Sequence, residues 1–167
     1  MAVEDIRTWV WTGDTVINSV AVADVDGDSV LEIVTGGYYT DGVRIAQLVT
    51  WNGADLAVED IRTWYWTGDT IINSVAVADV DGDSVLEIVT GGYFNDGTRD
   101  VAQLVVWDGT TLEVGPLTVW YWTGDTRINS VAIGNVDADA SEEILTAGYY
   151  NDGTNLNAQL VVWGIHA

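Results

Sequence analysis

The feature that most constrains the fold of this chain is a threefold internal repeat. WVWTGDT at residues 9–15 returns twice as WYWTGDT, at 64–70 and at 120–126, so the copies are 55 or 56 residues apart. A repeat of this length is typical of propeller blades and solenoids, in which one small unit stacks on itself. The first two copies are nearly identical, which indicates recent duplication or deliberate design. We treat the chain as a single module of three repeats, at about 5–59, 60–115 and 116–167.

Each repeat has the pattern of four short strands and no helix. Runs rich in Val, Ile, Thr, Trp and Tyr alternate with Gly, Asp and Asn, which favour turns. In the first copy the runs lie at 6–11, 17–23, 32–37 and 45–51. Four strands per repeat make one blade of a β-propeller. We therefore predict an all-β β-propeller with three four-stranded blades per chain. Large residues such as Trp9 and Trp11 suit an outer strand that packs against the neighbouring blade.

The charge and composition exclude several classes of function. The chain has no cysteine, which rules out disulfides and thiolate metal sites. Five basic residues against 26 acidic ones give a net charge of −21, which argues against nucleic-acid partners and anionic membrane surfaces. No apolar run approaches the roughly 18 residues of a membrane span, and we recognise no signal-peptide pattern.

Acidic residues are concentrated in one loop of each repeat. ADVDGDSVLE occupies residues 23–32 and returns at 78–87, with acids at the first, third, fifth and ninth places counted from the first Asp. Two carboxylates about 4 Å apart repel by about 4 kcal/mol at an effective dielectric constant of about 20, so something must offset the crowding. Calcium takes about six to eight oxygen ligands, and magnesium fits less well because it keeps its waters. The alternative is an Asp-rich turn that holds no ion.

The spacing assigns candidate Ca²⁺ ligands to each loop. In the two intact loops the seventh residue would contribute its backbone carbonyl, and the Glu could bind through both oxygens. The candidates are Asp24, Asp26, Asp28, Val30 and Glu32, then Asp79, Asp81, Asp83, Val85 and Glu87, and in the altered third loop Asn135, Asp137, Asp139 and Glu143. The third loop has lost one charge and its glycine, which is replaced by Ala138, so we expect a weaker site there. Gly27 and Gly82 are expected to adopt a backbone conformation that other residues resist.

The stretch SVAVADVDGDSVLEIVTGG resembles the FG-GAP or VCBS repeat, the blade of integrin-α-like propellers. The likeness covers all three repeats. It implies a calcium role for the acids of the first two loops, a partial one for the third, and an extracellular or cell-surface location. The family often has a second Gly where this chain has Ser29, Ser84 and Ala140, and often ends the loop in Asp where this chain has Glu. These departures affect the expected affinity but remove no oxygen ligand.

Three blades leave exposed sheet edges, which promote association. The chain begins with an outer-strand segment and ends with AQLVVW, the third strand of a blade. We expect the first strand of one copy to complete the last blade of the next, which is a head-to-tail contact that must close to avoid fibres. Two copies would give six blades and three would give nine; propellers have about four to eight. The expected partner is therefore a second copy, in a six-bladed homodimer. The alternative is that the chain is a piece of a longer array.

Nothing in the sequence indicates catalysis, and we expect no enzymatic activity. The one histidine, His166, is next to the C-terminus, and no Ser–His–acid set or phosphate loop is present. Two functions remain open: a calcium-stabilised scaffold, and a module that binds carbohydrate or protein. Aromatic rings beside Asp could stack on a sugar, although they could equally cap the strand ends. These ligand-binding candidates are Tyr38, Tyr39, Asp41, Tyr93, Phe94, Asp96, Tyr149, Tyr150 and Asp152.

Overall fold

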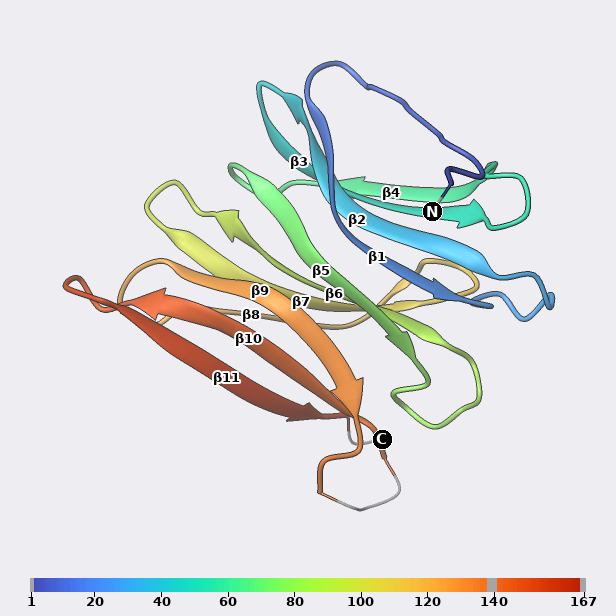
Figure 1. The fold of residues 1–167 in the computed structure, drawn as a ribbon. Helices are drawn as coiled ribbons and strands as arrows, with labels where there is room; N and C mark the ends of the chain where they lie inside the picture. The colour runs from blue at the N-terminus through green and yellow to red at the C-terminus, as the bar shows by residue number, and fades with distance from the viewer. Residues whose placement is uncertain (1, 138–140, 166–167) are drawn as a thin grey trace.

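The computed structural model describes residues 2–137 and 141–165, and this part of the chain is all-β (Figure 1). Its strands form three antiparallel sheets, in the orders β1-β2-β3-β4, β5-β6-β7-β8 and β11-β10-β9. Within these residues the sheets do not close into a ring or barrel, and no helix is present that could cross a membrane. The strands are β1 (Thr15–Ala23), β2 (Glu32–Asp41), β3 (Val43–Asn52), β4 (Val58–Trp64), β5 (Thr70–Ala78), β6 (Glu87–Asn95), β7 (Asp100–Asp108), β8 (Val114–Trp120), β9 (Thr126–Gly134), β10 (Glu143–Asn151) and β11 (Leu156–Gly164).

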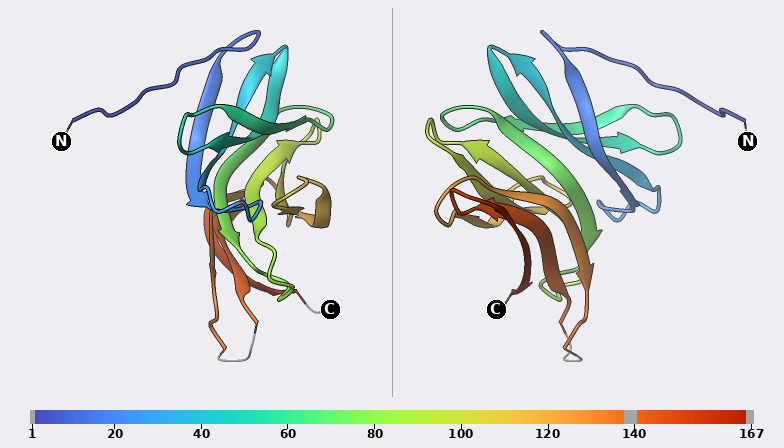
Figure 2. Two further views of the ribbon diagram at one scale, coloured as in Figure 1. Left: turned by 90° about the vertical axis from the view of Figure 1, so that its right-hand side faces the viewer. Right: turned by 60° about the vertical axis from the view of Figure 1, so that its left-hand side comes forward.

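Each four-stranded sheet takes its outer strand from the beginning of the next repeat. β4 pairs with β3, and β8 pairs with β7. The strands predicted at 17–23, 32–37 and 45–51 are confirmed as β1, β2 and β3, which extend further than expected. The segment predicted as a strand at 6–11 pairs with no strand of the described chain, because β4 already occupies the outer edge of β3. Its expected pairing with a second copy stays a prediction. Figure 2 shows the N-terminal segment leaving the body as an extended trace.

Neighbouring sheets pack closely where β-branched side chains cover a glycine. Ile72 and Val75 of β5 lie over Gly36 of β2: a Cβ added to Gly36 would stand 2.6 Å from Cγ2 of Ile72 and 2.6 Å from Cγ1 of Val75. The same arrangement recurs one repeat later, where Ile128 and Val131 of β9 lie over Gly91 of β6. The core between the first two sheets includes Val34, Leu48, Ile88, Val105, Trp107 and Leu112.

Each intersheet contact is also fixed by two side-chain hydrogen bonds. The amide of Asn18 donates to the carbonyl of Ile72 at 2.7 Å, and the N–H of Val75 donates to Ser19 Oγ at 3.0 Å. One repeat later Asn73 and Ser74 make the same two bonds to β9, at 2.7 Å and 3.0 Å. We call this combination of Asn, Ser, Ile, Val and Gly the intersheet interface.

The tryptophans that end β4 and β8 pack between neighbouring sheets, as expected for an outer strand. Trp11 is instead 47% exposed and stacks on Tyr39. Trp64, at the end of β4, donates from its indole N–H to Gln103 Oε1 of the second sheet at 3.1 Å. Its ring centroid lies 4.9 Å from that of Trp107. Trp120 and Trp163 repeat this pairing at 4.9 Å. The outer rim of the molecule is therefore held by pairs of large aromatic rings.

We expect replacement of Gly92 by Ala to lower the free energy of unfolding by about 1–3 kcal/mol, the usual effect of overpacking. The added Cβ would stand 1.9 Å from the carbonyl oxygen of Ile71, where the pairing of β5 and β6 shifts register. Urea denaturation measures the change. Gly134→Ala is the matched control, because nothing lies within 4 Å of its added Cβ. Equal stability of the two variants would contradict this account.

Candidate metal centre

The first acidic loop is shaped by its own aspartates, which accept backbone hydrogen bonds. Asp24 accepts from the N–H of Gly27 at 2.8 Å and of Ser29 at 3.0 Å. Asp26 accepts from the N–H of Asp28 at 3.1 Å. Gly27 has a φ of +79°, so the predicted special conformation of this glycine is confirmed. These bonds hold the carboxylates at fixed positions in a tight turn.

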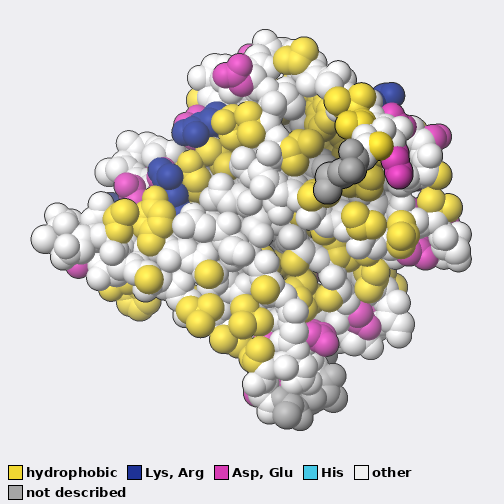
Figure 3. All heavy atoms as spheres, in the orientation of Figure 1, with side chains coloured by type: hydrophobic (Ala, Val, Ile, Leu, Met, Phe, Trp, Pro, Cys, Tyr) yellow, Lys and Arg dark blue, Asp and Glu magenta, His cyan; other side chains and the backbone are white. Residues whose placement is uncertain are grey.

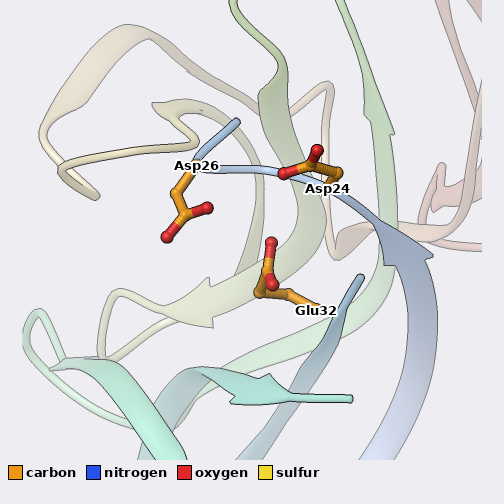
Figure 4. A group of neighbouring side chains, drawn as sticks. All are labelled: Asp24, Asp26 and Glu32. Carbon is orange, nitrogen blue, oxygen red and sulfur yellow. The ribbon is translucent and has the colours of Figure 1, made fainter. Parts of the chain in front are cut away.

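Three acids of this loop converge on one point. Ligand atoms of Asp24, Asp26 and Glu32 lie within 4.8 Å of one another, and Figure 4 shows the Glu32 carboxylate directed between the other two. Asp24 follows β1 and Glu32 begins β2, so adjacent antiparallel strands deliver them to the same end of the sheet. Such a group of carboxylates could hold a metal ion.

Glu32 is the residue of this loop that most strongly favours a bound cation. The side chain is 1% exposed. One carboxylate oxygen, Oε2, accepts from the N–H of Val25 at 2.8 Å, while Oε1 is buried with no hydrogen-bond partner among the described residues. A buried carboxylate oxygen left unpaired costs free energy. A cation between the three carboxylates would satisfy it, so the residues present fit a metal site.

The pKa of the Glu32 carboxyl also favours a bound cation. Burial raises the pKa of the Glu32 carboxyl and outweighs the hydrogen bond from Val25, which lowers it. Repulsion from Asp26 and Asp28 adds to the rise. Because the folded-state pKa lies above the unfolded value, this carboxyl favours folding at low pH, and its contribution is lost as the pH rises through the folded-state pKa. At neutral pH a bound cation would offset that loss.

The second loop repeats the first. Asp79, Asp81 and Glu87 bring ligand atoms within 4.8 Å of one another. Glu87 accepts from the N–H of Val80 at 2.8 Å, and burial raises the pKa of its carboxyl above the usual range. Gly82 has a φ of +84° and so also confirms the predicted glycine conformation. Two buried acidic triads in the described chain could therefore each hold a metal ion.

The remaining predicted ligands lie outside these two triads. Asp28 and Asp83 instead accept hydrogen bonds from the N–H groups of Val30 and Val85, each at 2.7 Å. Their coordination of an ion, and that of the Val30 and Val85 carbonyls, stays a prediction. In the third loop Glu143 accepts from the N–H of Val136 at 2.8 Å, as in the other repeats. Asp139 falls outside the described residues, as do Ala138 and Ala140.

The aromatic ligand-binding candidates all contact neighbours within the chain. Tyr39, Phe94 and Tyr150 each pair with a tryptophan, at centroid distances of 5.6, 5.3 and 5.9 Å. Tyr93 is buried, and its ring centroid lies 4.1 Å from Cζ of the Arg127 guanidinium. Asp96 and Asp152 accept backbone hydrogen bonds within their turns. These contacts favour the alternative in which the aromatic rings cap the strand ends; sugar binding stays an untested prediction. His166 falls outside the described residues.

Sequence reasoning missed two arginine–aspartate pairs that cross the sheets at the opposite end of the strands from the acidic loops. Arg44 binds Asp69 through its backbone N–H and its guanidinium, at 2.6 to 2.9 Å. Burial would raise the pKa of Asp69, but these bonds lower it on balance. Arg127 of the third sheet binds Asp100 of the second sheet. The signal that could have found these pairs was the small number of basic residues, five against 26 acidic ones.

Comparison with known proteins adds no assignment. A scan against protein-family models finds no match for this chain. A search of curated proteins finds no match either.

We expect Ser29→Gly to raise the free energy of unfolding by about 1 kcal/mol, because glycine adopts a positive φ without steric cost. Ser29 and Ser84 both have a φ of 73°. They stand at the positions where FG-GAP or VCBS repeats, which this chain resembles, often have glycine. The same substitution at Ser84 should add a similar gain, since the two loops are separate. Thermal and urea denaturation measure both variants; a loss of stability would show that the serine side chains have a role.

Proposed function

We propose that this chain is a non-enzymatic, calcium-stabilised β-propeller module that closes a six-bladed ring by head-to-tail association of two copies. The observation that carries the proposal is that the two outer faces of the sheet stack are the two halves of an interface that already occurs twice inside the chain. The resemblance of the repeats to FG-GAP or VCBS blades supports the same assignment.

Calcium is the cation that best suits the acidic triads. The available donors are carboxylate oxygens, which are hard ligands, and there is no cysteine for a softer metal. Bound calcium would supply positive charge to oppose the carboxylates. The loops themselves tie the end of one strand to the start of the next, through Asp24 and Glu32 in the first repeat. Ion binding would therefore stabilise the fold rather than take part in a reaction.

Glu32→Gln should separate the cost of the buried charge from the gain of ion binding. Without divalent ions we expect the variant to be at least as stable as the parent, because Gln keeps an oxygen for the Val25 N–H and removes a buried charge. With calcium at 100 times its dissociation constant, each occupied site adds about 2.7 kcal/mol. The variant should lose one such gain, and Glu32→Gln with Glu87→Gln should lose two. Melting curves with chelator and with calcium measure this.

The control for this experiment is Glu113→Gln, which removes an exposed carboxylate outside both triads. It should respond to calcium as the parent chain does. Melting curves that are identical with chelator and with calcium would contradict calcium stabilisation. A response to magnesium equal to the response to calcium would contradict the choice of ion.

The first support for ring closure is an exposed half of the intersheet interface on β1. Ile17 and Val20 are 46% and 60% exposed, whereas their counterparts Ile72 and Val75 are 2% and 6% exposed. Hydrophobic side chains also reach the surface in the space-filling view (Figure 3). Such a face is expected to be covered by another surface.

The complementary half is exposed on the third sheet. Asn129 and Ser130 of β9 stand where the first two sheets have the Asn and Ser of the intersheet interface, which bond to the following sheet. Both residues are exposed, and no sheet of the described chain follows β9–β11 to receive them. A second copy in head-to-tail contact would bring the Ile17 carbonyl and the Val20 N–H towards these two side chains, in the register of the internal interfaces. Such polar bonds would fix the register of the contact.

The second support is an open strand edge on the third sheet together with an unpaired N-terminal segment beside the first sheet. The third sheet ends at β11, whose outer edge has no neighbour in the described chain, while β3 and β7 are covered by β4 and β8. Trp9 packs 4.6 Å from Trp51, as Trp64 packs on Trp107. The segment before Trp9 therefore leaves the body where β4 and β8 would lie in the other sheets. Strand addition to β11 of a second copy would pair both sets of backbone groups.

We expect a particle mass near twice the chain mass of 18.0 kDa, about 36 kDa, in calcium buffer. Light scattering after size exclusion measures it. Val20→Arg should give a folded monomer, because the side chain is exposed in one copy but would be buried in the ring. Val114→Arg is the matched control, on an exposed position of β8 away from this interface. A parent chain that stays monomeric would contradict ring closure, and a mass near three times that of one chain would mean nine blades.

A further inference from the structure

One residue of the third sheet breaks the pattern of the intersheet interface. Thr-Gly-Gly at 35–37 and 90–92 becomes Thr-Ala-Gly at 146–148, so Ala147 stands where the first two sheets have Gly36 and Gly91. In the monomer Ala147 is exposed, because no further sheet of the described chain covers β10. The consequence of this alanine appears only when a second copy is placed against it, so a role for Ala147 rests on the proposed ring.

The backbone places Ala147 in the same position as the two glycines. Gly36 pairs with Ser19 on one side and Leu48 on the other. Ala147 pairs with Ser130 and Leu160, which are the corresponding residues of the third repeat. The register shift of the inner pairing also falls next to Gly36 in the first sheet and next to Ala147 in the third. The Cβ of Ala147 therefore points where a Cβ on either glycine would point.

In the first two sheets, side chains of the next sheet fill the space into which this Cβ would point. A Cβ on Gly36 would be 2.6 Å from both Ile72 and Val75, and one on Gly91 would be 2.4 Å from Val131 and 2.8 Å from Ile128. Carbon atoms in contact normally lie about 3.5–4.0 Å apart. In a head-to-tail contact copied from the internal ones, the Ala147 methyl would meet Ile17 and Val20 of the second copy at the same short distances. The side chains responsible are β-branched and have few rotamers to escape into.

We propose that the interface between copies is a widened form of the internal interface, held apart by Ala147, and is the joint at which the ring opens. The sheets must separate there by about 1 Å to reach ordinary contact distances. Both joints of a two-copy ring are of this kind, whereas the four internal ones keep glycine. The three-bladed chain thus stays intact while the ring exchanges subunits at its Ala147 joints. The partner selected is a second copy of this chain, through β1.

Ala147→Gly tests this proposal directly. It should lower the dissociation constant of the dimer by about tenfold or more, which is the relief expected from removing one overpacked methyl per joint. It should also slow subunit exchange between two fluorescently labelled batches in calcium buffer. Sedimentation over a dilution series gives the dissociation constant. The matched control is Gly91→Ala, which places the same methyl in an internal interface, where it should lower the melting temperature of the chain.

The outcomes separate this inference from the ring itself. Tighter association and slower exchange of Ala147→Gly would support the widened joint. A dimer whose dissociation constant and exchange rate are unchanged by Ala147→Gly would overturn it and leave the ring standing. Monomers in both the parent chain and the variant at every concentration would overturn the ring, and this inference with it.

Discussion

The close approach of neighbouring sheets over a glycine is the constraint on which the rest of the molecule depends. Ile72 and Val75 reach the backbone of β2 only because Gly36 has no side chain, and β9 uses Gly91 in the same way. This contact sets the distance between sheets, and through it the Asn18 amide reaches a carbonyl of the next inner strand. At the outer rim the same distance lets tryptophans such as Trp64 bridge to the following sheet. A repeat protein of this kind depends on its nearest-neighbour interfaces as much as on its individual units.

The excess of negative charge is the second constraint, and the acidic residues have different partners at the two ends of the strands. At one end, Arg44 and Arg127 each pair with an aspartate across sheets, so two of the chain's five arginines connect repeats. At the other end the acidic loops have no such cation among the described residues, and Glu32 is buried with an unpaired oxygen. A net charge of −21 weakens the compact state through self-repulsion. Binding of divalent ions by two loops is the direct physical remedy available to this sequence.

Much of the architecture could be predicted from the repeat. Strands β1, β2 and β3 follow from alternating β-rich runs and Gly-Asp turns, and the convergence of Asp24, Asp26 and Glu32 follows from their spacing. The strand predicted at 6–11 does not form within the single chain, because strand formation depends on a neighbouring strand that the described part of the chain does not supply. The unpaired oxygen of Glu32 and the positive φ of Ser29 were also beyond prediction, since both depend on how the loop closes in three dimensions.

The third repeat departs from the others at Ala147, which stands in place of a glycine. This repeat has no further sheet of the described chain beside it, and in the proposed ring it would face a second copy. An internal interface is formed at very high effective concentration, so its packing can demand a bare glycine. A contact between separate copies would instead form at the concentration of the free chain, which is much lower. In the proposed ring, a methyl group at position 147 would reduce the fit of that contact, while Asn129 and Ser130 would still mark its register. The proposed widened joint would let the same fold hold its own repeats firmly and a second copy reversibly.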